Sequence, residues 1–191
     1  MESQKLKIDE EFKHLIHPLK KIEYLQLENN IIADGCRDPI ITWMGIIVDG
    51  HNRYEICNKH NIPFKTVEMD FVCREAAIAW ICANQLGRRN ISEETRKFLI
   101  GMQYESEKVV TRIRNVRGRN QYNADRYLSE ISEEDSDIPV KHVTAKRIAD
   151  ENHVSLGTVQ KYAIYTRALE EIGRKEPQLV PKILSGNYGN L

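Results

Sequence analysis

The chain has 191 residues, 41% of them hydrophobic, and its 28 basic and 28 acidic side chains give a formal net charge of zero. This length suits one domain or two small ones, and the hydrophobic fraction excludes wholesale disorder. A zero net charge argues against a polycation that coats nucleic acid over its whole surface. The sequence has no apolar run long enough to span a membrane and no signal-peptide core, so we expect a cytoplasmic protein without a membrane partner.

The four cysteines indicate free thiols. Cys36, Cys57, Cys73 and Cys82 form no CxxC pair and have none of the spacings typical of structural zinc. Reduced thiols agree with a cytoplasmic location.

Residues 1–111 predict a small α+β domain with a mixed sheet. A short strand and a turn at Pro18 come first, followed by a loosely amphipathic helix that ends at Gly35. Two β-rich runs around Met44-Gly45 predict a hairpin. The next expected elements are a helix over 51–60, a strand over 65–71, an Ala-rich helix over 74–87, and a helix that Ser92 caps.

Residues 112–142 have a different character and predict a charged linker. Residues 112–126 carry five arginines and one aspartate, and residues 130–137 carry five acids and no base. Such oppositely charged polar blocks are typical of a flexible connection. A basic arm that neutralises phosphates is the alternative.

Residues 143–191 predict an all-helical module that binds double-stranded DNA. In "TAKRIADENHVSLGTVQKYAIY", Ala149 is the small residue that two touching helices need, and Val154 would fill the turn between them. His153 stands where glycine is preferred. An ordinary helical hairpin used for packing is the alternative. The residues expected to face DNA are Ser155, Gly157, Thr158, Gln160 and Lys161.

Three clusters of hydrogen-bonding residues in the first domain predict a phosphate or nucleotide site. The central cluster, at the passage from a strand into the helix over 51–60, combines bare helix N–H groups with an arginine. Ordinary surface ion pairs are the alternative for each cluster. The expected nucleotide-binding residues are Gly35, Cys36, Arg37, Asp38 and Pro39; Asp49, Gly50, His51, Asn52, Arg53 and Tyr54; and Asn84, Gln85, Arg88 and Arg89.

The order "GCRDPI…IIVDGHNRYEICNKHNIPF…ANQLGRRNIS" resembles the N-terminal domain of ParB, the chromosome and plasmid partition proteins, within the ParB/sulfiredoxin-like fold. The following helix–turn–helix agrees with the ParB layout. The resemblance implies a plasmid- or phage-borne partition or regulatory protein that binds DNA and a nucleoside triphosphate, CTP or ATP, with Mg²⁺. In the third quoted stretch, which begins with Ala83-Asn84, the family carries an acid where this chain has Ala83, so Asn84 is the expected metal-binding residue. A homodimer is also open.

The same fold suggests three other activities. Sulfiredoxins carry a catalytic cysteine where this chain has His51, which excludes that activity. "DGHNR" is also similar to a box of free-serine kinases, in which Glu23 or Glu28 would act as general base on ATP- or ADP-dependent transfer. A nuclease ranks third, because the sequence shows no acidic metal cluster. Nucleotide hydrolysis, as in a CTPase, stays open.

Overall fold

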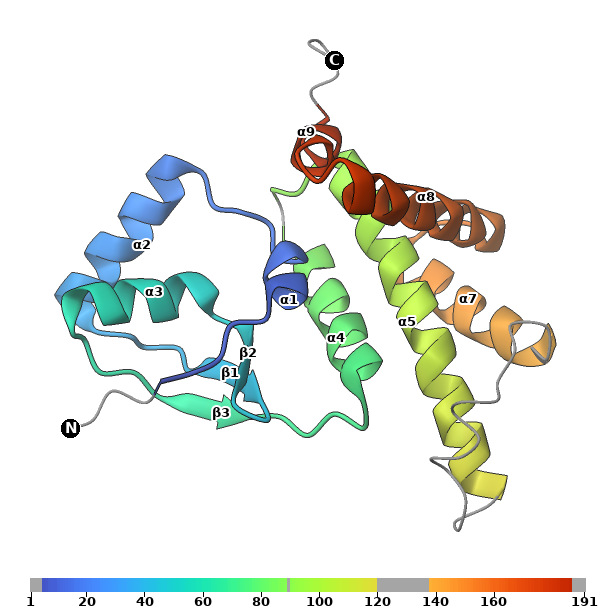
Figure 1. The fold of residues 1–191 in the computed structure, drawn as a ribbon, viewed down its shortest axis with the longest axis horizontal. Helices are drawn as coiled ribbons and strands as arrows, with labels where there is room; N and C mark the ends of the chain where they lie inside the picture. The colour runs from blue at the N-terminus through green and yellow to red at the C-terminus, as the bar shows by residue number, and fades with distance from the viewer. Residues whose placement is uncertain (1–4, 89, 120–137, 187–191) are drawn as a thin grey trace. The chain divides into compact units, whose positions relative to one another are not determined.

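The computed structural model describes residues 5–88, 90–119 and 138–186, and the chain divides into two compact units, Met1–Phe71 and Val72–Leu191. Together they form the expected mixed α+β fold (Figure 1). Among the described residues no helix combines the length and the apolar composition that crossing a membrane requires.

The sheet of the first unit is built on a hairpin. β1 (Ile40–Trp43) and β2 (Ile46–Asp49) pair antiparallel, and Met44 and Gly45 connect them with φ angles of 51° and 74°. Two successive left-handed residues form the tight turn whose twist matches paired strands. The predicted hairpin is therefore confirmed.

β3 (Thr66–Glu68) pairs parallel to β1 and gives the strand order β2-β1-β3. It is shorter than the expected strand over 65–71. The strand expected near the N-terminus is a single bridge from Lys7 to Ile46, and α1 (Glu10–His14) follows it. Asp9 caps α1 by accepting from the Phe12 N–H, which explains why the chain turns helical there.

Of the first unit's helices, α3 (His51–His60) packs against the sheet and α2 (Lys21–Asp34) packs against α3. The two helices lie side by side, and Ile31, Ile56 and Cys57 are buried in the cluster between them (Figure 1). Tyr54 of α3 packs with Ile40 and Ile47 of the sheet. α3 thus has one side toward β1 and β2 and another toward α2, which fixes the position of its N-terminus.

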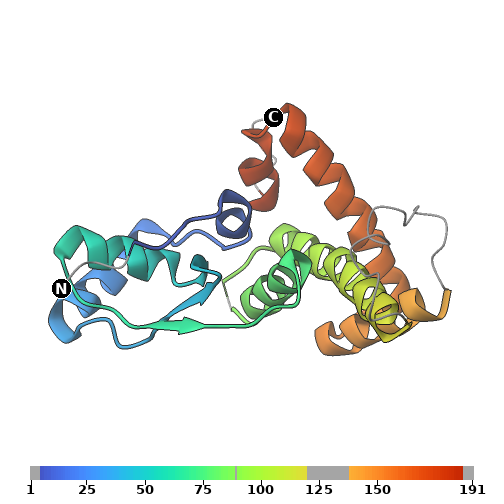
Figure 2. The same cartoon turned by 60° about the horizontal axis from the view of Figure 1, so that its bottom comes forward.

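The second unit is all-helical and consists of α4 (Arg74–Leu86), α5 (Glu93–Arg119), α7 (Ile138–Asn152), α8 (Leu156–Lys175) and α9 (Leu179–Leu184). α5 is its central element and contacts the other four helices (Figure 2). Residues 112–119 and 138–142, expected in the linker, are helical. Val110 and Ile113 are buried on α5, so its packed face continues beyond residue 111. The rest of the expected linker lies outside the described residues.

The turn between α7 and α8 has the geometry that the sequence predicts. His153 adopts a φ of 55°, the left-handed conformation for which glycine is preferred. Ser155 caps α8, because its Oγ accepts from the Thr158 N–H at 3.1 Å. Ala149 and Val159 are buried, and Val154 packs against the same cluster.

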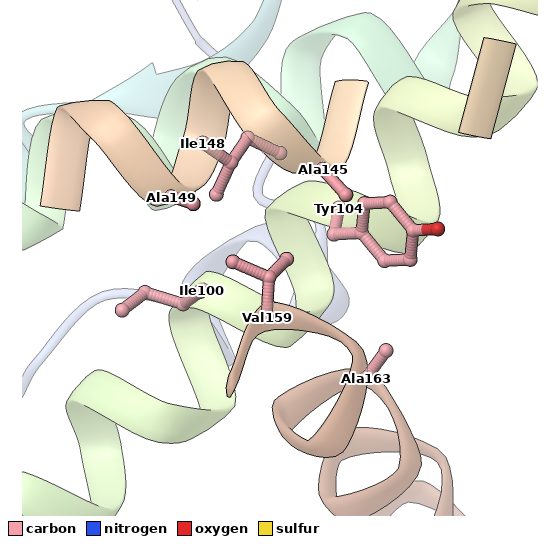
Figure 3. Packing of buried hydrophobic residues seen from close by; sticks show 7 residues of the cluster. All are labelled: Ile100, Tyr104, Ala145, Ile148, Ala149, Val159 and Ala163. Carbon is pink, nitrogen blue, oxygen red and sulfur yellow. The ribbon is translucent and has the colours of Figure 1, made fainter. Parts of the chain in front are cut away.

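Three helices share this cluster (Figure 3). Figure 3 shows side chains from all three pointing toward one another: Ile100 and Tyr104 from α5, Ala145, Ile148 and Ala149 from α7, and Val159 and Ala163 from α8. The α7–α8 pair is therefore held on α5 and is more than an isolated hairpin.

The crossing of α5 and α8 depends on Gly101. A Cβ there would overlap the Thr166 hydroxyl and the Tyr162 carbonyl, and the Thr166 Oγ1 donates to the Phe98 carbonyl at 3.0 Å. A glycine inside a helix costs about 1 kcal/mol relative to alanine. At this position the missing side chain lets the backbones of α5 and α8 approach closely.

Gly101→Ala should therefore destabilise the second unit, although alanine favours helix. We expect a net loss of about 1–3 kcal/mol in the free energy of unfolding, because forced overpacking exceeds the gain in propensity. Chemical denaturation followed by circular dichroism measures it. Gly157→Ala is the matched control, since the nearest atom to its Cβ would be 3.9 Å away. Equal or higher stability of Gly101→Ala would contradict the packing argument.

Candidate functional site

The passage from β2 into α3 leaves a helix N-terminus without a side-chain cap. Gly50 occupies the N-cap position with a φ of 96°, and the first intrahelical bond runs from the Tyr54 N–H to the Gly50 carbonyl. Because glycine has no side-chain oxygen, the N-cap residue cannot cap the first N–H groups of α3. Together with the positive end of the helix dipole, they favour an anion.

Arg53 is held beside this N-terminus. Its Nη2 donates to Asp49 Oδ2 at 3.0 Å and to the Pro39 carbonyl at 3.1 Å. The same nitrogen lies 3.0 Å from where a Cβ on Gly50 would stand, so a larger residue would displace the guanidinium. Its Nε is buried and has no hydrogen-bond partner within the described residues.

His51 is the second buried polar group at this position. It is 8% exposed, and neither ring nitrogen has a hydrogen-bond partner among the described residues. Burial lowers its pKa to about 4, against the opposing effect of the Asp49 carboxylate. The imidazole is therefore neutral at pH 7, when one ring nitrogen donates and the other accepts.

Together these groups can bind an anionic oxygen. Arg53 and the neutral imidazole add buried donors to the backbone N–H groups of α3, and leaving such donors unpaired is costly. Sequence reasoning found these residues but missed α1, whose Lys13 and Glu10 side chains act on the pKa of His51. No local signal indicated it, because only the fold joins positions so far apart in the chain.

The remaining residues of the first two clusters divide into structural and exposed groups. Pro39 contributes its carbonyl to Arg53, and Tyr54 is buried, where its hydroxyl accepts from the Leu6 N–H at 3.1 Å. Arg37 is exposed and pairs with Asp34 at 2.9 Å. Gly35 ends α2, Cys36 and Asn52 are half-buried, and Asp38 is exposed. The geometry thus brings Pro39, Asp49, Gly50 and Arg53 together.

The third cluster belongs to the second unit. Asn84 is exposed on α4, whereas Gln85 is 1% exposed and lies in the packed interior. The Arg88 N–H donates to the Gln85 carbonyl at 3.0 Å, and Arg89 lies outside the described residues. In the described part of the chain, no three histidine, cysteine, aspartate or glutamate side chains gather as a metal site.

Both glutamates considered as kinase bases have structural partners. Glu23 Oε2 accepts from the Lys20 N–H at 2.9 Å at the start of α2. Glu28 accepts from Lys59 Nζ at 2.8 Å and contacts His60 Nε2 at 2.7 Å. The hydrogen bond from Lys59, followed by that from His60, lowers the pKa of Glu28, which makes it a weaker base. The kinase alternative stays a prediction without a favouring observation.

The first turns of α8 present the residues predicted to face DNA. Ser155, Gly157, Gln160 and Lys161 are exposed and Thr158 is half-buried, whereas Val159 and Ala163 turn toward the core. The predicted surface therefore surrounds the α8 N-terminus on the side away from the packed face. Exposed polar and basic groups at this end of a helix can reach phosphates and base edges.

The fold is similar to that of known ParB N-domains. No family model and no curated protein matches the sequence. Among solved structures, the C2221 form of a pNOB8-like ParB N-domain matches with a TM-score of 0.58 and 20% identity, over 91% of this chain and 71% of that one. A second pNOB8-like ParB N-domain structure has a TM-score of 0.56 and 21% identity, over 98% and 68% of the two chains. The chain therefore has a ParB N-domain fold.

The neutral state of His51 makes stability depend on pH. In the unfolded chain His51 binds a proton near pH 6.5, and in the folded chain it does so only near pH 4. The contribution of neutral His51 to the free energy of unfolding is therefore fully present above pH 6.5 and is lost as the pH falls toward 4. The expected loss is of order 1–3 kcal/mol. Unfolding measured between pH 4 and pH 7.5 should show a flatter pH dependence for His51→Gln. His153→Asn, at an exposed histidine, should keep the wild-type slope; equal slopes in all three would contradict the burial argument.

Proposed function

We propose that this protein is a ParB-like, partition-related DNA-binding protein whose first unit binds a nucleoside triphosphate. The observation that supports it most directly is the pair of buried donors, His51 and Arg53, at the uncapped N-terminus of α3. A triphosphate offers the oxygens that such donors need. The ParB N-domain fold supports the assignment to partition.

The nucleotide would place a phosphate at α3. The N–H groups of its first turn and Arg53 would donate hydrogen bonds to the phosphate oxygens, and His51 would donate one further hydrogen bond. Mg²⁺, when bound, neutralises phosphate charge. Most ligands of the ion would be phosphate oxygens and water, as is usual for magnesium.

α8 would enter the major groove in this proposal. Its N-terminal residues Thr158, Gln160 and Lys161 would contact bases and phosphates, while α5 holds α7 and α8 in a fixed arrangement. Nucleotide occupancy of the first unit would then change DNA affinity, which makes the protein a ligand-controlled DNA binder. An ordinary packing hairpin would show no DNA affinity.

Arg53→Gln should abolish the stabilisation that a nucleotide gives. A ligand that binds only the folded state raises the melting temperature, so we expect a concentration-dependent rise for the wild type with CTP, ATP or GTP in the presence of Mg²⁺. Removing the guanidinium, which can donate two parallel hydrogen bonds to a phosphate, should weaken nucleotide binding more than about tenfold. Isothermal titration calorimetry gives the affinity.

Arg174→Gln is the matched control, because Arg174 is exposed and pairs with Glu171 on α8. It should leave nucleotide affinity unchanged. If the glutamine variant does not fold, Arg53→Lys replaces it in the test, because lysine keeps the positive charge but lacks the planar guanidinium. Full nucleotide affinity in folded Arg53→Gln would contradict the site.

Lys161→Ala should weaken DNA binding and flatten its salt dependence. If Lys161 neutralises one phosphate, the slope of log affinity against log salt falls by about one. Fluorescence anisotropy with a mixed-sequence duplex, measured over a salt series, gives both quantities. Lys175→Ala is the matched control, because Lys175 lies at the far end of α8 and pairs with Glu171. Identical slopes for wild type and Lys161→Ala would remove α8 from the interface.

A further inference from the structure

Two of the four free thiols lie together in the core of the first unit. Cys36 follows α2 directly, Cys57 lies on α3, and Cys36 packs against the buried cluster that contains Cys57. The two thiols are near enough for Cys36 to affect the pKa of Cys57. The Cys36 thiol also donates to the Asp38 carbonyl at 3.4 Å. Two thiols that share one packed cluster meet the first requirement of a disulfide, which is proximity.

The two thiols differ in access. Cys57 is 1% exposed, whereas Cys36 is half-buried and open to solvent on one side. Burial, with a smaller effect of the neighbouring Cys36 thiol, raises the pKa of Cys57 to about 12. A small oxidant can therefore reach Cys36 first, and Cys57 can react only with the sulfur beside it.

We propose that Cys36 and Cys57 form a redox-sensitive pair that a low-molecular-weight disulfide converts into an intramolecular disulfide. With glutathione disulfide, the Cys36 thiolate attacks one sulfur, breaks the S–S bond and releases one glutathione thiolate. Cys57 then loses its proton to solvent, and its thiolate attacks Cys36 Sγ and releases the second glutathione. Two protein thiols are oxidised, and glutathione disulfide is reduced to two glutathiones.

The new bond would tie the segment after α2 to the middle of α3. The pair closes a chain segment from residue 36 to residue 57, which contains the hairpin, and such a crosslink reduces the freedom of the unfolded chain. The oxidised protein should melt at a temperature higher by about 5 °C or more. This inference stands independently of nucleotide binding, since it concerns thiol chemistry alone.

The test is a titration of the full chain with mixtures of reduced and oxidised glutathione, quenched with acid and analysed by mass spectrometry after tryptic digestion. Cleavage at Lys21, Arg37, Arg53 and Lys59 leaves Cys36 on residues 22–37 and Cys57 on residues 54–59. A crosslink between these two peptides that dithiothreitol removes, together with the rise in melting temperature, is the expected result.

Three variants separate the steps. Cys57→Ala should accumulate a glutathione adduct on Cys36, and Cys36→Ser should leave Cys57 reduced, because no oxidant reaches it. Cys73→Ser removes another half-buried thiol and should behave as the wild type. A wild-type chain that keeps glutathione on Cys36 with Cys57 still reduced overturns the proposal. So does a chain whose crosslinks join Cys73 to either cysteine as readily.

Discussion

At Gly50 the chain leaves β2 and enters α3 with a left-handed backbone, and the Arg53 guanidinium lies against the space where a side chain would be. One nitrogen of that guanidinium bonds both Asp49 and the Pro39 carbonyl. The end of β2, the start of β1 and the first turn of α3 are therefore joined by one side chain. The candidate anion site depends on this contact, because it fixes the donors of Arg53 relative to the N–H groups of the helix. A Cβ at residue 50 would disturb all of these groups at once.

The packing of the second unit fixes which face of α8 stays exposed. α5 packs against α7 and α8 through its close crossing with α8 at Gly101 and through the cluster around Ile148 and Val159. Side chains on one face of α8 are therefore buried in this packing, and the residues on the other face of its first turns stay exposed. The first turn of α5 is also joined to the end of α9, since the Thr95 hydroxyl donates to the Leu184 carbonyl at 3.0 Å. A fixed helix loses little entropy when it docks.

Local signals in the sequence predicted the elements well, and the tertiary packing decided what they missed. Met44-Gly45 indicated the hairpin, and Ser155 indicated the start of α8, because turn and cap chemistry act over a few residues. The charges after residue 111 favoured a linker, yet Val110 and Ile113 extend the buried face of α5, and burial outweighs composition. In the site, "DGHNR" was informative because Gly50 and Arg53 interact within one turn. The sequence could not show that Gln85 is buried, since burial depends on neighbours that only the fold brings together.

The charge of the site constrains which anion it suits. Arg53 is largely offset by Asp49, and burial keeps His51 neutral, so the residues around the α3 N-terminus carry little net positive charge. Attraction must then come from directed N–H groups and the helix dipole, each of which acts over a short range. The proposed phosphate would therefore be recognised by its geometry more than attracted from a distance by charge. If the site binds the proposed nucleotide, a phosphate group whose charge is already shared with Mg²⁺ would match it best, because partial neutralisation lowers the cost of placing the anion beside the Asp49 carboxylate.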